Sequence, residues 1–136
     1  MNRRGQALVE LAVCLPVLLL VAIGAVQFVR LAVARAGLDA ATAAAVAAAA
    51  REPTGAAAIA AGEAAFDGVA AGYDLGPTAV LNVDPGDFGR GAQFTATARV
   101  DLVLGLAGIT GLAPAWRLTS AASARVEDWR SRPASP

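Results

Sequence analysis

Strongly apolar residues are concentrated near the start of the chain, where Leu, Val and Ile are densest between positions 8 and 33. No side chain between Leu11 and Val26 is charged. An α-helix over about residues 7–29 would be roughly 35 Å long at 1.5 Å per residue. That length suffices to cross a hydrocarbon core of about 30 Å. The pattern therefore predicts one transmembrane helix, preceded by a short basic leader at residues 1–5.

Beyond the predicted span, the composition remains that of a helix. Residues 30–51 are rich in alanine, leucine and arginine and contain no proline. Pro53 and Gly55 then end the helical pattern. We therefore expect one nearly continuous helix from about Ala7 to Arg51, within an N-terminal segment 6–52. One stripe of this helix carries apolar residues at spacings of three and four: Leu31, Ala34, Leu38, Ala41 and Ala45.

A second, shorter helix is predicted after Pro53. Thr54 is a suitable N-cap, and the pattern continues to about Ala71, before Gly72. Ile59, Phe66 and Val69 share a face of this helix.

After Gly72 the pattern changes to that of strands separated by turns. Residues 78–83 predict a short strand, and residues 94–102 alternate strictly between apolar and polar positions. Residues 117–127 alternate again, after a Gly/Leu/Ala loop at 105–114. The larger side chains expected to be buried between sheet and helix are Phe94, Val100, Leu102, Leu118 and Val126.

So few strands need a cover on one face to be stable, and the alanine-rich helices provide the available cover. The predicted fold class is α+β, a long N-terminal helix packed on a small antiparallel sheet. The extracytoplasmic domain should span residues 53–130, followed by a disordered tail at 131–136.

Composition excludes several kinds of function. The formal charge is zero, from 11 basic and 11 acidic residues, which argues against a nucleic-acid partner. The chain has no histidine, and its only cysteine is Cys14. A Cys/His zinc site and Ser-His-Asp or Cys-His catalysis are therefore excluded within one chain. We expect no cofactor, no metal and no small-molecule substrate.

Three weaker features receive structural interpretations. Asp84, Asp87 and Asp101 do not have the spacing of a calcium loop, and aspartates are common in turns. The glycine-rich segment 86–91 lacks the lysine of a phosphate-binding loop. Trp116 and Trp129 are interpreted mainly as packing residues, with an interface role as the alternative.

The polar residue that stands out is Glu10, one turn into the apolar helix. Inserting a carboxylate into the membrane costs up to about 3 kcal/mol at the bilayer centre and less near the interface. A carboxylate in an apolar helix therefore favours a charged partner. If the chain were cut after Gly5, the new amine of Gln6 would lie near the same depth. Glu10 of a neighbouring chain would then neutralise it. The alternative is that Glu10 lies at headgroup level without a role.

This arrangement resembles the class III signal peptides of pilins and pseudopilins, in which a basic leader ends in glycine and the fifth residue after the cut is glutamate. Here those positions are Gly5, Gln6 as the first mature residue, and Glu10. The stretch Arg4–Leu11, with Leu15 and Pro16 following, closely resembles the TadE-like family of the tight-adherence (Flp) pilus system. The resemblance includes Phe28 and Arg30, returns at residues 118–127, and is absent from about 52–92.

The resemblance implies a minor pseudopilin that is not an enzyme. Such a protein is held in the inner membrane as a single-pass protein and processed by a prepilin peptidase between Gly5 and Gln6. Its partners are other pilin or pseudopilin subunits and pilus-assembly proteins, and Glu10 acts in assembly. Major Flp pilins are similar at the N-terminus but much shorter, so the additional domain favours the minor class.

Two other hypotheses remain open from the residues alone. One is a membrane-anchored extracytoplasmic binding module unrelated to pili, in which Glu10 is incidental. The other is a secreted protein with a cleaved signal, although the apolar run is long for a signal peptide. The mature N-terminus distinguishes the three hypotheses, because it would be Gln6, an uncut Met1, or a residue beyond the apolar run.

Overall fold

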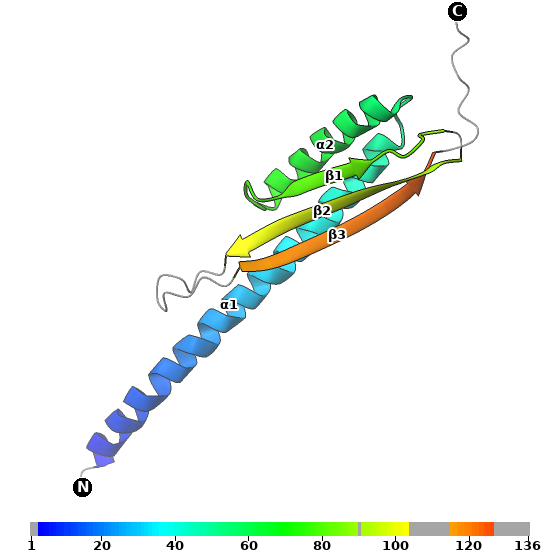
Figure 1. The fold of residues 1–136 in the computed structure, drawn as a ribbon. Helices are drawn as coiled ribbons and strands as arrows, with labels where there is room; N and C mark the ends of the chain where they lie inside the picture. Colours follow the sequence, from blue (N-terminus) through cyan, green and yellow to red (C-terminus); the bar gives the residue numbers. More distant parts are fainter. Residues whose placement is uncertain (1–2, 90, 104–114, 127–136) are drawn as a thin grey trace, which may run out of the picture. The chain divides into compact units, whose positions relative to one another are not determined.

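The computed structural model describes residues 3–89, 91–103 and 115–126. Two helices, α1 (Arg3–Ala49) and α2 (Gly55–Gly72), are followed by three strands, β1 (Val80–Asp84), β2 (Gln93–Val103) and β3 (Ala115–Arg125) (Figure 1). The chain divides into two compact units, residues 1–32 and 33–136. The predicted α+β class, a long apolar helix with a small antiparallel sheet, is confirmed.

The first unit consists of helix. From Gly5 to Arg30, every side chain is exposed except those of Ile23 and Gln27, which are half-buried. Helix α1 continues through Pro16 and is, within the described residues, the helix long and apolar enough to cross a membrane. It begins at Arg3, several residues before the predicted start at Ala7, and ends at Ala49, two residues before the predicted end.

The second unit begins with a helical hairpin, in which α2 runs back along α1. Gly62 of α2 lies where an added Cβ would be 3.4 Å from the Ala45 carbonyl oxygen of α1. At the other end of the hairpin, Tyr73 follows α2 and lies against Gly37 of α1. The small side chains on both helices permit this close approach.

Helix α2 has the predicted N-cap. Thr54 has an extended backbone, and its hydroxyl oxygen accepts a hydrogen bond from the Ala57 N–H at 3.3 Å. The predicted face is displaced slightly, because the fully buried stripe is Ala58, Gly62, Phe66 and Ala70. Ile59 and Val69 lie half-buried beside that stripe.

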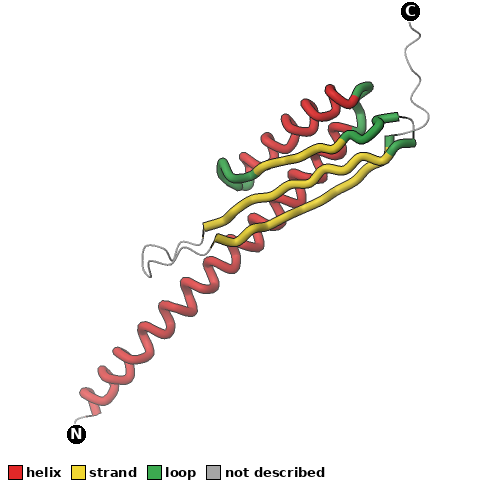
Figure 2. The backbone as a smooth tube through the Cα atoms, in the orientation of Figure 1, coloured by secondary structure: helices red, strands yellow, loops and turns green. Residues whose placement is uncertain are grey.

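The strands form an antiparallel sheet in the order β1-β2-β3 (Figure 2). In β2 the residues from Phe94 to Val100 alternate between buried and exposed, as the sequence pattern predicts. Strand β3 begins two residues earlier than predicted, because its pairing extends to Trp116 opposite Leu102 and Ala115 opposite Val103. The predicted loop at 105–114 and the tail at 131–136 lie outside the described residues.

The inner face of the sheet packs on both helices in two adjoining clusters. One contains Leu38 of α1, Phe66 of α2 and Val100 of β2, and the other contains Val46, Ala58 and Phe94. Burying a side chain the size of Phe66 or Phe94 contributes about 1.5–3 kcal/mol. Of the five predicted core residues, Phe94, Val100 and Val126 are buried and Leu102 and Leu118 are partly buried.

Candidate functional site

Gly5, Gln6 and Glu10 lie in α1, and all three are exposed. A Cβ added at Gly5 would meet no atom within 4 Å, so packing does not require glycine there. Gln6 and Glu10 are four residues apart, which corresponds to a rise of about 6 Å, or roughly one turn. The structure therefore places the two residues on one side of the same helix.

Cleavage after Gly5 would change the electrostatics of this segment. Gln6 would become the first residue, and its charged amine would join the free N–H groups at the start of the helix. Carboxylates are favoured near such a helix start and beside a cation. Glu10, as the fifth residue of the processed chain, then has a cationic partner within reach, either in its own helix or in a neighbouring one.

The surface around Glu10 is apolar. Large side chains of this segment are exposed around the helix, among them Leu8, Leu11, Leu15, Leu18, Leu19 and Val21. Such a surface is unfavourable in water, and the helix is long and apolar enough to be a candidate membrane span. Pro16 removes the backbone donor for the Ala12 carbonyl, which membrane helices tolerate better than exposed soluble ones.

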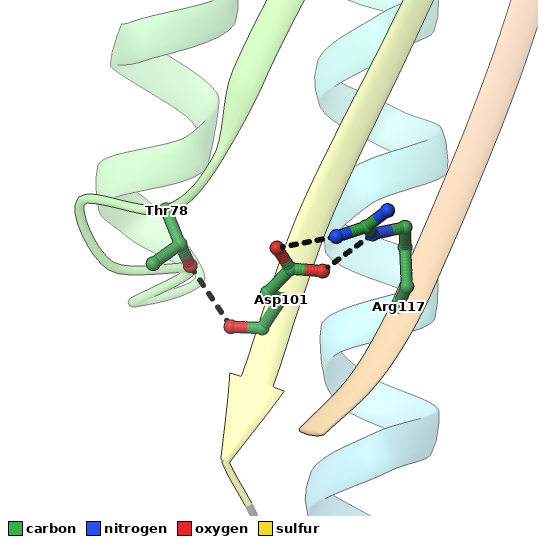
Figure 3. A network of polar contacts seen from close by, with 3 residues as sticks. All are labelled: Thr78, Asp101 and Arg117. Carbon is green, nitrogen blue, oxygen red and sulfur yellow. Dashed lines mark hydrogen bonds and ion pairs between the residues drawn. The ribbon is translucent and has the colours of Figure 1, made fainter.

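In the second unit, two of the three aspartates considered for a calcium site, Asp84 and Asp101, have structural partners. Asp101 accepts hydrogen bonds from Arg117 at 2.8 Å (Nε) and 3.3 Å (Nη2), and its backbone carbonyl accepts one from the Thr78 hydroxyl at 2.9 Å (Figure 3). The hydrogen bonds from Arg117 lower the pKa of Asp101. Asp84 accepts a hydrogen bond from the Gly86 N–H at 3.0 Å within a tight turn. These contacts join strands and close turns.

One polar contact between α1 and β3 was missed by the sequence analysis. Ser120 is buried on the inner face of the sheet, and its hydrogen bond to Asp39 lowers the pKa of that carboxyl. Arg35 adds to the effect from one turn away, with its Nε 3.2 Å from Asp39. The available signal was a serine at an inner-face position of the alternation between Leu118 and Ala122.

Trp116 does not act as a packing residue. Its side chain is 49% exposed, although its position in the alternation places it on the inner side of β3, opposite Leu102. The packing interpretation of Trp116 is therefore wrong. Trp129 lies outside the described residues.

Comparison with known protein families gives a match to the family described as TadE-like protein over residues 5–52. This confirms the resemblance predicted from Gly5, Glu10 and the apolar helix, and it associates the chain with the tight-adherence pilus system. The match does not include residues 118–127, where the sequence also shows a resemblance. Neither the curated proteins nor the solved structures gave a match.

Proposed function

Because residues 5–52 of this chain match the family described as TadE-like protein, we propose that the chain is a minor pseudopilin. In this proposal it acts in the assembly or secretion of tight-adherence pili and is not an enzyme. The protein is anchored in the inner membrane by residues of about 7–29, with the α+β unit outside the cytoplasm. A prepilin peptidase removes residues 1–5.

The single observation that carries the proposal is the exposed apolar helix of the first unit with Glu10 as its carboxylate. Every described side chain from Gly5 to Arg30 is exposed except those of Ile23 and Gln27, which are half-buried, so the described residues leave most of this helix uncovered. Lipid would cover it in the membrane, and the helices of other subunits would cover it in an assembly. Glu10 would then pair with the Gln6 amine, which exists only after processing.

The first test is the mass of the N-terminus in cells that contain the peptidase. We expect the mature chain to begin at Gln6 and Gly5→Leu to keep its full-length mass. Gly24→Leu is the matched control, since Gly24 also lies in α1 with no atom near its Cβ position and should be processed normally. Normal trimming of Gly5→Leu, or a mature chain that begins at Met1 or beyond the apolar run, would contradict the proposal.

The second test separates assembly from insertion. Glu10→Leu removes a charge from an apolar helix, so it should insert at least as well as the wild type. It should nevertheless lose crosslinks to pilus-assembly components and reduce piliation, while Glu10→Asp, which keeps the charge with a shorter reach, should be intermediate. Glu63→Leu, at an exposed position of α2, is the control and should assemble normally. If Glu10→Leu inserts, crosslinks and supports piliation like the wild type, Glu10 has no role in assembly.

A further inference from the structure

The second unit carries exposed apolar and aromatic side chains at the end where the chain enters it. Val33 is the first residue of the unit and is 48% exposed. Tyr73 is 42% exposed and lies against Gly37, one turn along the same helix. Val103, at the end of β2, is 66% exposed and Trp116, near the start of β3, is 49% exposed.

Core contacts show which end of the unit holds the end of β2 and the start of β3. Val100 of β2 shares a cluster with Ala34 and Leu38, whereas Phe94 shares one with Val46 and Ala49. Strand β2 therefore runs towards the beginning of the unit. The strand register then places Trp116 opposite Leu102 and Ala115 opposite Val103 at that same end.

Chain length keeps this end of the unit close to the membrane. Val33 follows Val29, the last residue of the predicted span, by four positions. Residues 29–33 belong to α1, in which four residues rise about 6 Å. The two headgroup regions together add about 10–15 Å to a hydrocarbon core of about 30 Å, so each side adds about 5–8 Å. Val33 therefore lies within or just beyond the headgroup region, whatever the orientation of the unit.

We propose that this end of the second unit, which we call the entry surface (Val33, Tyr73, Val103 and Trp116), docks on the lipid headgroup region of the bilayer. Tyr and Trp are enriched at that depth because each has an apolar ring and one polar group. Val33 adds apolar surface on α1, and Val103 adds it at the same end of the sheet, on the opposite face from Trp116. The inference rests on the proposed membrane anchoring of residues 7–29 and assigns Trp116 a role that core packing does not provide.

The charges around the entry surface fit a zwitterionic lipid. Arg35 is paired with Asp39, and Arg117 is paired with Asp101. Arg30, three residues before Val33, and Asp74, next to Tyr73, carry opposite charges, so this end has no clear preference for an anionic headgroup. Phosphatidylcholine, which carries no net charge, is therefore the lipid of the test.

The test uses the full chain in phosphatidylcholine vesicles, with Trp129→Phe leaving Trp116 as the sole tryptophan. Phospholipids brominated near the headgroup end of their acyl chains quench tryptophans at the interface, and we expect them to remove most of the Trp116 emission. The matched control carries Trp116→Phe, Trp129→Phe and Phe88→Trp. Phe88 packs on Phe94, away from the entry surface. The tryptophan that replaces Phe88 should therefore keep its emission in the presence of the brominated lipid.

Flotation of the vesicles separates failure of this inference from failure of membrane anchoring. If the chain floats with the vesicles but Trp116 is quenched by aqueous acrylamide and not by the brominated lipid, the docking is wrong and the anchoring stands. If Trp116 is shielded from both quenchers, protein covers the entry surface and the docking is again wrong. A chain that does not float with the vesicles overturns the anchoring and the docking together.

Discussion

Individual residues in the second unit are constrained by how closely its elements approach. Gly37 interrupts an alanine-rich helix, where glycine costs about 1 kcal/mol relative to alanine. Its role is the contact with Tyr73, since a Cβ on Gly37 would lie 2.6 Å from the Cβ and Cγ of Tyr73. Those atoms are close to the backbone, so they cannot move away without moving the end of α2.

Gly37→Ala should therefore destabilise the second unit, although alanine is the better helix former. Overpacking of this kind costs about 1–3 kcal/mol, and the gain in helix propensity offsets up to about 1 kcal/mol of it. Urea unfolding of the full chain in mild detergent, followed by circular dichroism, measures the difference. Gly68→Ala is the control, because no atom lies within 4 Å of its Cβ position and the substitution should stabilise α2 by about 0.5–1 kcal/mol. Equal effects at the two glycines would contradict the predicted clash.

Asp39 should make the stability of the second unit depend on pH in the acid range. The hydrogen bond from Ser120 lowers the folded-state pKa of Asp39, so the carboxylate stabilises the folded state at pH values above its unfolded pKa. That contribution is lost as the pH falls through the folded pKa, below about pH 4. About half of the Asp39 side chain is exposed, so solvent screening should keep the effect small.

The measurement is the urea midpoint of the wild type and of Asp39→Asn between pH 7 and pH 3. Asn retains a hydrogen-bonding side chain without the titration, so its midpoint should fall less on acidification. Asp101, whose pKa is also lowered, titrates in both proteins and does not affect the comparison. Identical acid profiles would show that Asp39 does not contribute.

At the scale of elements, stability depends on β2 lying between two neighbouring strands and against the helices. The residues of β2 that face the helices are all buried: Phe94, Ala96, Ala98 and Val100. Alanine at two of these positions lets the sheet approach the helices closely. Small residues also let the two helices approach each other closely at Ala45, Ala58 and Gly62.

Val100→Asp should cost several kcal/mol, because it buries a charge without a partner in a fully enclosed position. Thr97→Asp is the matched control on the exposed face of the same strand, where the cost should stay below about 1 kcal/mol. Unfolding in mild detergent, as for Gly37→Ala, compares the two variants. An unchanged Val100→Asp protein would mean that the two faces of β2 are assigned in reverse.

For the whole molecule, the topology in the membrane decides where the second unit functions. We expect Arg3 and Arg4 to remain in the cytoplasm and residues after Arg30 to be outside. The charge bias for this orientation is weak, because Arg30 and Arg35 flank the other end of the span.

An alkaline phosphatase fused to the C-terminus should be active, since this enzyme matures outside the cytoplasm. A fluorescent protein that matures only in the cytoplasm is the matched control and should remain dark in the same fusion. The opposite pair of results would reverse the topology. It would also remove the route by which the second unit could reach an external pilus.

The pattern of apolar residues by itself determined the type of nearly every described element. The apolar run and the stripe from Ala34 to Ala45 require a helix, and the alternation from Phe94 to Leu102 requires a strand, because these periods follow from local backbone geometry. Thr54 was likewise identifiable as a cap, since capping is local. The short basic leader with Gly5 and Glu10 was enough to indicate the family.

Only the tertiary structure decided how these elements meet. It showed that Gly37 makes room for Tyr73, that Ser120 holds Asp39, and that Trp116 lies exposed at the end of the sheet. None of these follows from sequence spacing. The two contacts join residues far apart in the chain, and the exposure of Trp116 depends on which segments pack against it. All three depend on how closely small side chains let helices and strands approach. The periodicity of β3 could assign Trp116 to a face, but it could not show that the helices leave that part of the face uncovered.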